Sequence, residues 1–245
     1  MVSSNSKSMS NNWFEFKQFI VYQDRAAMKV GTDGVLIGAW AQADAPQRVL
    51  DIGCGTGLIA LMVAQRWPEA RIDAIDSDQN AYNQSRANFE NSCWSQRLTA
   101  HLVKLQEFES EQSYDLIISN PPYFVNSLKN SDSSKSAARH TDSLSHAELL
   151  EHAARLLSDI GRFALILPAD LKTELLRESQ QVGLWAHRVT DVLDREDRNP
   201  IRIMVEFRKY ICSQPVVDRL IIRDLTSNDY TEQYKSLTRD FYLKF

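Results

Sequence analysis

Residues 48–57 read RVLDIGCGTG, an apolar stretch that runs directly into a turn with three glycines. The following nine residues, 58–66, carry apolar side chains at helical spacing, and the helix is expected to stop before Trp67, which precedes a proline. Glycines let the backbone turn tightly and approach a ligand closely where a helix begins. The stretch therefore predicts a buried strand, a ligand-binding turn and a helix.

An acidic residue ends the next expected strand. This strand, 71–76, finishes with Asp76, which lies 19 residues after Gly57 (76 − 57). In open α/β folds a carboxylate at about this distance from the glycines accepts hydrogen bonds from the hydroxyls of a ribose. The spacing therefore indicates that the ligand is a nucleoside.

The spacing of the glycines narrows the class of nucleoside. The pattern is G-x-G-x-G, whereas dinucleotide folds use G-x-G-x-x-G, and no lysine follows the turn as it does in a phosphate-binding P-loop. Asp51 places a carboxylate immediately before the glycines, which favours a cationic ligand over a diphosphate. S-adenosylmethionine fits this description, and its predicted contacts are Asp51, Gly53, Gly55, Gly57 and Asp76.

A second motif, NPPY at 120–123, follows an apolar strand predicted at 115–119. Two successive prolines cannot continue a strand, so the chain must leave the sheet at its carboxyl end, where open α/β sheets bind ligands. The Asn120 side-chain oxygen and the Pro121 carbonyl can accept the two hydrogens of a planar amino group, and the Tyr123 ring offers a face for stacking. An ordinary turn is the alternative interpretation of this motif.

Together these motifs resemble the class I S-adenosylmethionine-dependent methyltransferases, and the NPPY motif resembles that of the branch that methylates planar nitrogens. The stretches FKQF at 16–19, MKVGTDGVLIGAW at 28–40 and DFYL at 240–243 are similar to the bacterial valine-tRNA adenine-N6 methyltransferase family. This resemblance runs from about Trp13 to Phe245. It implies methylation of N6 of adenosine 37, immediately 3′ of the anticodon.

The resemblance also implies roles for individual residues. Those that would line the cofactor pocket are Thr32, Asp33, Asp51, Gly53, Gly55 and Asp76. The target base would be held by the motif itself and its neighbour, namely Asn120, Pro121, Pro122, Tyr123 and Phe124. One position departs from the pattern, because Lys104 stands where such enzymes often have an acid that accepts a hydrogen bond from the adenine amine of the cofactor.

The expected fold class is α/β, a doubly wound, mostly parallel sheet of seven strands with a short N-terminal extension. Residues 1–12 are predicted to be disordered and 13–245 to form one methyltransferase domain. A capping box at Ser145 predicts the start of a helix. The last two predicted strands, 185–192 and 201–208, would form an antiparallel pair with Arg202 pointing outward.

Composition favours an intracellular enzyme. The chain has 245 residues, 43% of them hydrophobic, with no apolar run of transmembrane length and no signal-peptide pattern, so a cytoplasmic location without membrane contact is expected. Its three cysteines, Cys54, Cys93 and Cys212, show no paired spacing, which argues against disulfides and a metal site. Cys54 is interpreted as a small filler of the glycine turn. The sequence does not indicate an oligomeric state.

The formal net charge of −4 does not match an RNA substrate, because phosphate contacts normally supply much of the affinity. A local group of cations offers a solution. Lys129, Lys135 and Arg139 lie in a polar stretch just after the NPPY motif and are predicted to contact tRNA phosphates. A plain solvated loop is the alternative.

Several other functions share parts of this pattern. Enzymes that methylate a glutamine amide of translation release factors carry the same motif behind a helical recognition domain, and only 47 residues precede Arg48 here. Guanine-N2 methyltransferases of ribosomal RNA use a similar loop. A nicotinamide oxidoreductase would need different glycine spacing. A non-catalytic RNA-binding protein would show no methyl transfer.

Overall fold

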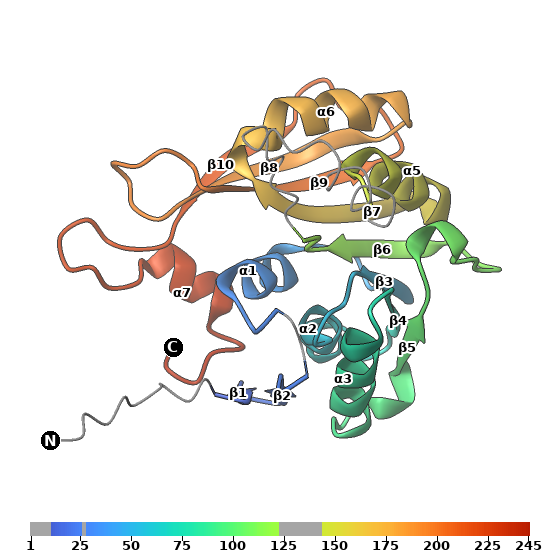
Figure 1. The fold of residues 1–245 in the computed structure, drawn as a ribbon. Coiled ribbons are helices and arrows are strands. Elements are labelled where there is room, and N and C mark those ends of the chain that lie inside the picture. Colours follow the sequence, from blue (N-terminus) through green and yellow to red (C-terminus); the bar gives the residue numbers. More distant parts are fainter. Residues whose placement is uncertain (1–10, 26–27, 123–143) are drawn as a thin grey trace, which may run out of the picture.

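The structure, a computed structural model, describes residues 11–25, 28–122 and 144–245 of the chain (Figure 1). The strands are β1 (Trp13–Glu15), β2 (Ile20–Tyr22), β3 (Arg48–Ile52), β4 (Arg71–Asp76), β5 (Leu98–Leu102), β6 (Tyr114–Ser119), β7 (Leu157–Pro168), β8 (Trp185–Leu193), β9 (Arg202–Arg208) and β10 (Val216–Ile221). The α-helices are α1 (Thr32–Trp40), α2 (Leu58–Arg66), α3 (Gln79–Glu90), α5 (His146–Leu156), α6 (Lys172–Gln181) and α7 (Glu232–Thr238). Short 3-10 turns are η1 (Ser95–Arg97), η2 (Leu105–Glu107) and η3 (Ala169–Leu171).

A sheet of eight strands in the order β10-β8-β9-β7-β6-β3-β4-β5 forms the centre of the fold. Among its described strands, β9 alone runs antiparallel to its neighbours, β7 and β8. The chain starts the sheet at β3, proceeds outward through β4 to β5, and then returns to the other side of β3 with β6. The strand order thus reverses between β3 and β6, where open α/β sheets bind ligands.

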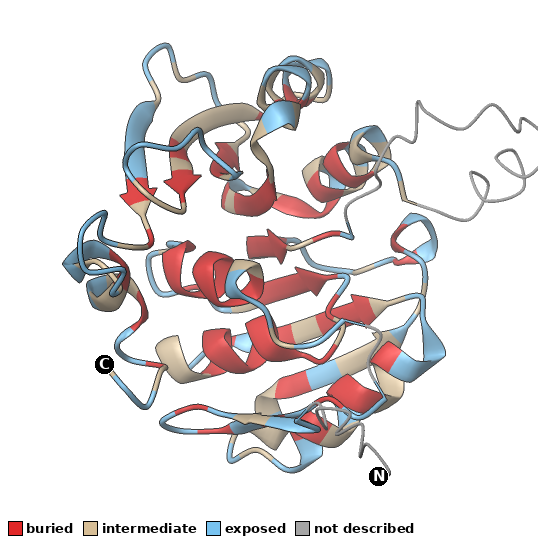
Figure 2. Ribbon diagram, turned by 60° about the vertical axis from the view of Figure 1, so that its left-hand side comes forward, coloured by how far each residue is buried: buried red, intermediate tan, exposed pale blue. Residues whose placement is uncertain are grey.

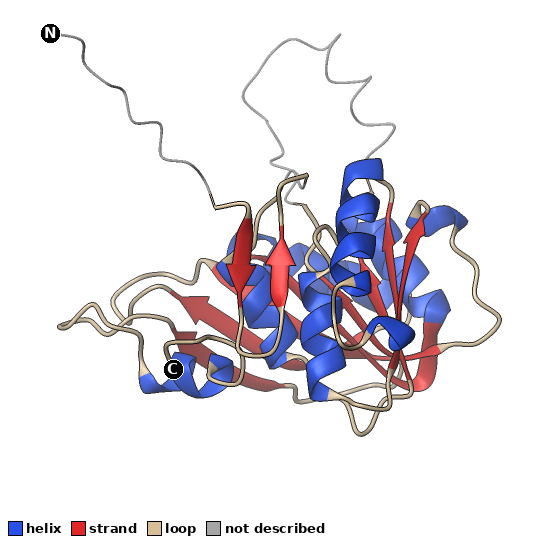
Figure 3. Ribbon diagram, turned by 90° about the horizontal axis from the view of Figure 1, so that it is seen from below, coloured by secondary structure: helices blue, strands red, loops and turns tan. Residues whose placement is uncertain are grey.

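Helices cover both faces of the sheet, and the inner strands between them are largely buried (Figures 1 and 2). One apolar cluster joins the sheet to α1 and α2, while another joins it to α5 and α6. This explains why β3 and β6 are nearly continuous apolar runs, since both of their faces are covered. The hairpin β1–β2 lies on the side of α2 and α3 (Figure 3).

The prediction of seven strands was wrong by one. All seven predicted strands are present, but β10 adds an eighth by pairing in parallel with β8 at the edge of the sheet. Four of its six residues are exposed, so the strand has no hydrophobic alternation that a sequence pattern could detect. The Ser145 capping box is confirmed as the start of α5.

The predicted disorder of residues 1–12 falls mostly outside the described residues, which begin at Asn11. The carbonyls of Asn11 and Asn12 accept hydrogen bonds from the side chain and the backbone of Gln23, at 2.9 and 2.7 Å. Asn11 and Asn12 are therefore fastened to the segment after β2 by these two hydrogen bonds, and the boundary at Trp13 stays a prediction.

Candidate active site

Three parallel strands bring the predicted motifs together. In the sheet register Ile52 of β3 is paired with Ile75 of β4 and with Ser119 of β6. The residues that follow these three positions are Gly53, Asp76 and Asn120, so the glycine turn, the acid and the NPPY motif begin side by side. The Ser119 hydroxyl donates a 2.9 Å hydrogen bond to the Ile52 carbonyl, which holds the end of β6 against β3 just before Asn120.

The glycine turn needs all three glycines, but for two different reasons. Gly53, Gly55 and Gly57 have φ of 72°, 55° and 79°, a region that side chains rarely adopt. A Cβ at Gly53 or Gly55 would meet nothing within 4 Å, so these two face open space. A Cβ at Gly57 would lie 2.5 Å from the Phe89 ring, so Gly57 serves the packing of α2 against α3. The predicted contact of Gly57 with the cofactor stays a prediction, and packing alone already accounts for a glycine at this position.

The two predicted carboxylates both support this turn. Asp76 accepts 2.9 Å hydrogen bonds from the backbone N–H of Gly55 and of Asp78, and its side chain remains partly exposed. Asp51 is 1% exposed and accepts a hydrogen bond of 3.2 Å from the Ala60 N–H in α2, while its buried Oδ1 atom has no hydrogen-bond partner among the described residues. Asp51 thus lies behind the turn rather than in the space that Gly53 and Gly55 face.

A cavity of about 350 Å³ opens beside the turn, a size within the range of small-molecule sites. Gly53 and Gly55 line it from one side, and Thr32 and Asp33, at the start of α1, line it from another. Asn120 reaches the same cavity from the end of β6. The amide nitrogen of Asn120 would lie 3.9 Å from a Cβ placed on Gly34, which shows how closely α1 approaches the motif.

The remaining predicted substrate residues are only partly described. Pro121 is buried and Pro122 is exposed. Tyr123, Phe124, Lys129, Lys135 and Arg139 lie outside the described residues. Lys104 is exposed at the start of η2, directly after β5.

Arg202 is a cavity residue that the sequence pattern assigned wrongly. It was expected to point outward from its strand, yet it lines the cavity, and its Nε lies 2.8 Å from the Asp33 carboxylate. The cause is the register, because Arg202 pairs with Pro168 at the carboxyl end of β7 and so faces the start of α1. The sequence pointed to Arg202 only indirectly, because Asp33 was a predicted pocket residue and its charge favours a cation nearby.

Cys54, interpreted from the sequence as a small filler of the turn, also lines the cavity. It is 7% exposed. Burial, together with the negative charges of Asp51 and Asp76, raises the pKa of its thiol well above the usual value. The neutral thiol is a poor nucleophile, so the cavity offers no activated cysteine.

The N-terminal segment forms one wall of this cavity, through Met28 to Gly31. Three buried carboxamides fasten the segment in place. Asn88 donates 2.8 Å hydrogen bonds to the carbonyls of Tyr22 and of Thr56 in the glycine turn. The Gln84 side chain accepts a bond from the Arg25 N–H, and that of Gln23 accepts one from the Val30 N–H. We call Gln23, Gln84 and Asn88 the amide clasp.

Asp51 is expected to make stability depend on pH. Burial, and secondarily the charge of Asp76, raises its pKa from 3.8 to about 7, against the opposing effect of the Ala60 hydrogen bond. Between these values the folded state holds a proton that the unfolded state has lost, so rising pH favours unfolding. The loss attributable to Asp51 is on the order of 4 kcal/mol when complete.

The pH dependence of stability is measured by thermal unfolding of the wild type and of Asp51→Asn from about pH 4 to about pH 8. The side-chain amide of the variant does not titrate in this range, so the stability of the variant relative to the wild type is expected to increase as pH rises. Parallel curves for the two proteins would contradict the assignment of a raised pKa to Asp51.

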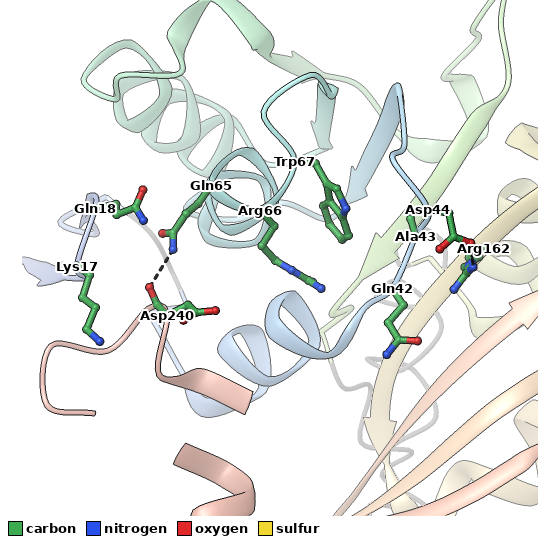
Figure 4. A pocket seen from close by; sticks show the side chains of 10 residues that line it. All are labelled: Lys17, Gln18, Gln42, Ala43, Asp44, Gln65, Arg66, Trp67, Arg162 and Asp240. Carbon is green, nitrogen blue, oxygen red and sulfur yellow. Dashed lines mark hydrogen bonds and ion pairs between the residues drawn. The ribbon is translucent and has the colours of Figure 1, made fainter. Parts of the chain in front are cut away.

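A further cavity, of about 680 Å³, lies at the opposite, amino end of the strands (Figure 4). Its cations already have partners. Lys17 donates to the carbonyls of Arg239 and Phe245 near the end of α7, and Arg66 donates to that of Gly38 in α1. Gln65 donates to the Asp240 carbonyl. These contacts satisfy carbonyls near helix ends, so we assign this cavity to the joint between the two ends of the chain.

The described residues show neither a membrane-spanning helix nor a cluster of metal ligands. No helix there has the length and apolar character required to cross a membrane. The same residues contain no group of three or more His, Cys, Asp or Glu side chains arranged to hold a metal ion.

Known proteins resemble this chain in both sequence and fold. Residues 30–183 match the model of the methyltransferase small domain family. A protein of Phocaeicola vulgatus named tRNA1(Val) (adenine(37)-N6)-methyltransferase is 46% identical over 96% of this chain and 99% of its own length. A protein of Citrobacter koseri with the same name is 39% identical over 99% of both chains.

Solved structures share the fold at low sequence identity. A predicted O-methyltransferase from Agrobacterium tumefaciens has a TM-score of 0.66 at 18% identity, covering 85% of this chain and 96% of its own. The Pyrococcus horikoshii protein TYW2, solved in complex with MeSAdo, has a TM-score of 0.55 at 16% identity, covering 78% and 69%. From its family-model match and its full-length relatives, the chain belongs to the tRNA1(Val) (adenine(37)-N6)-methyltransferase family, within the methyltransferases of the small-domain type.

Proposed function

We propose that this protein transfers the methyl group of S-adenosylmethionine to N6 of adenosine 37 in a valine tRNA. The observation that carries the proposal is the position of Asn120, which reaches into the cavity lined by Gly53 and Gly55. The names of relatives that cover at least 96% of the chain support the choice of nucleotide. A tRNA substrate implies that the protein acts in the cytoplasm.

The residues around the cavity fit this cofactor. S-adenosylmethionine supplies an electrophilic methyl group on a sulfonium, so a suitable site accommodates positive charge. The carboxylate of Asp33 lines the cavity, that of Asp76 accepts a hydrogen bond from the Gly55 N–H of the turn, and that of Asp51 lies behind the turn and accepts one from the Ala60 N–H. Asp76 is the candidate acceptor for the ribose hydroxyls because it lies at the end of β4 and is partly exposed. Open space beside Gly53 and Gly55 lets a ligand approach the backbone.

The difficulty of the reaction lies in the nitrogen. The N6 lone pair is delocalised into the adenine ring, so the amine is a weak nucleophile until it is oriented. Oxygen acceptors from Asn120 and Pro121 would hold both amine hydrogens and stabilise the positive charge that develops as the methyl arrives. This stabilisation grows toward the transition state, so no strong base is required. The new N–C bond forms as the C–S bond of the sulfonium breaks, the sulfur leaves as a neutral thioether, and the methylated amine then releases one proton to water. The target base must leave its stack, which costs least in a single-stranded loop.

The test is to incubate the protein with methyl-labelled S-adenosylmethionine and a valine tRNA transcript, and then to digest the RNA to nucleosides. N6-methyladenosine is the expected product, and it should disappear when guanosine replaces adenosine 37. Parallel incubations with ribosomal RNA and with release factors examine the guanine-N2 and glutamine-amide alternatives. Methylation of either in place of the tRNA would overturn the proposal.

Substrate binding is expected to depend on Lys129, Lys135 and Arg139. Replacing all three with Ala should weaken tRNA binding and flatten its salt dependence, by roughly 0.7 log unit of slope for each phosphate of a single strand that is no longer neutralised. Binding is measured by fluorescence anisotropy across a range of salt concentrations. If the slope of the salt dependence were unchanged, these three side chains would not contact tRNA phosphates.

A further inference from the structure

A second cavity lies at the carboxyl edge of the sheet, next to the one that holds Asn120. It measures about 190 Å³ and lies between the end of β8, the start of β9 and the segment that follows β10. The two cavities share Thr32, Asp33 and Arg202 in their walls. A ligand that extends toward β8 from the cavity lined by Asn120, which we call the methyl-transfer cavity, therefore passes Arg202 and enters the second cavity.

Apolar side chains form part of this second cavity. Val192 and Ile222 are buried and line its floor, while Ile201 is 43% exposed at its rim. The edge strand β10 is what brings Ile222 to this position, because the Ile222 N–H donates a 2.9 Å bond to the Leu193 carbonyl at the end of β8. The cavity thus offers an apolar surface to a flat group.

Planar groups complete the cavity on its other side. The Arg223 guanidinium lies 4.8 Å from the centroid of the Tyr230 ring, and this ring stacks on Tyr234 with centroids 4.7 Å apart and planes 14° apart. Arg223 and Tyr230 both line the cavity. Aromatic rings and guanidinium planes are the protein groups on which unstacked RNA bases are held.

Two arginines also provide positive charge on either side of the cavity. Arg223 donates a 3.1 Å hydrogen bond to the Asn228 carbonyl, but its pairing with a carboxylate is weak, since its Nε lies 3.9 Å from Asp194 and the two side chains are 36% and 48% exposed. Exposed pairs of this kind contribute little to stability, so Arg223 can exchange Asp194 for a phosphate at little cost. Arg202 stands at the boundary with the methyl-transfer cavity, beside Asp33.

We propose that this second cavity binds the base of one nucleotide next to the methylated adenosine against the Arg223 guanidinium plane, with the charges of Arg202 and Arg223 close to the phosphate that joins the two nucleotides. Its volume of about 190 Å³ is smaller than sites for drug-sized ligands, which suits a single base. The proposal rests on the proposed function, because it requires an RNA substrate. It assigns the segment after β10 to substrate recognition.

The test couples a protein change to an RNA change. Methylation of an anticodon stem-loop is measured for the wild type and Arg223→Gln, with an abasic site placed in turn at each nucleotide flanking the target. Arg223→Gln should raise KM for the RNA about tenfold, within the range of one stacked base, and leave the affinity for S-adenosylmethionine unchanged. An abasic site at one flanking position should raise KM for the wild type but add little in the variant.

Three further variants make the result specific. Arg223→Lys keeps the positive charge but lacks the planar guanidinium. Its RNA binding should therefore depend on salt as that of the wild type does, while an abasic site should still add little to its KM. Ile201→Ala changes an exposed side chain at the rim and repeats the test if Arg223→Gln fails to fold. Arg177→Gln, on the exposed side of α6, is the matched control and should behave as the wild type.

The increase in KM caused by Arg223→Gln and the increase caused by an abasic site could instead be independent at every flanking position. Independent increases would overturn the second cavity as a base-binding site but leave the proposed function intact. A wild-type protein that methylates no RNA would overturn both. Unfolding of the variants is followed by thermal melting in the same buffer.

Discussion

Replacing Asn120 with Ala is expected to lower the rate of methyl transfer by about a hundredfold to a thousandfold while leaving cofactor binding almost unchanged. The magnitude is that of removing one hydrogen-bonding group aimed at charge that develops in a transition state, roughly 2.7 to 4 kcal/mol. Cofactor binding should survive because the proposed partner of the Asn120 oxygen is the target amine. The Ser119 hydrogen bond that holds the end of β6 does not involve the altered side chain.

The rate is measured by single-turnover methylation with enzyme in excess and saturating cofactor, and cofactor affinity is measured by calorimetry. Asn91→Ala, at the exposed end of α3, serves as the control and should keep the wild-type rate. If Asn120→Ala kept the wild-type single-turnover rate, the NPPY motif would have to be interpreted as an ordinary turn, and the catalytic assignment of Asn120 would be wrong.

Gly55→Val is expected to weaken binding of S-adenosylmethionine by about a hundredfold, which corresponds to roughly 2.7 kcal/mol. The side chain would project into the open space beside Gly55, which is the space proposed for the ligand. A β-branched residue also disfavours the φ of 55° at this position, so the turn would distort as well. Calorimetry with the cofactor gives the affinity, and circular dichroism reports whether the variant folds.

Gly57→Ala provides the comparison that separates ligand contact from packing. Its Cβ would lie 2.5 Å from the Phe89 ring, so the substitution should lower the melting temperature more than Gly55→Val does. Its effect on the cofactor should follow only from the disturbed turn. Equal cofactor affinity in Gly55→Val and the wild type would contradict the placement of the ligand beside this turn.

The parts of the fold that the sequence predicted well are those with local signals. The bounds of β3 and α2 agree with the predicted 48–52 and 58–66, because an apolar run, a glycine turn and a helix stop before a proline are all encoded within residues 48–68. The meeting of Gly53, Asp76 and Asn120 was also predictable, since parallel strands place their carboxyl ends at one edge of the sheet.

What the sequence could not provide depends on pairing between distant segments. The exposed residues of β10 give no periodic signal, and its place beside β8 follows only from the assembled sheet. The same holds for Arg202, whose direction is set by the register of β9 against β7 and by the position of Asp33 on α1. The distinction between Gly55 and Gly57 likewise depends on where Phe89 lies.

The amide clasp has a consequence for dividing this protein into exchangeable modules. The match to the methyltransferase small domain begins at residue 30, but the clasp reaches back to Asn11 through Gln23 and forward to the glycine turn through Asn88. A chimera joined at Val30 would leave Gln84, 2% exposed, without the Arg25 N–H and Asn88, 1% exposed, without Tyr22, so that Asn88 would keep only its bond to the Thr56 carbonyl. Buried amides without partners are costly. A unit that is to be transplanted with this wall of the cavity intact must therefore extend back at least to Asn11.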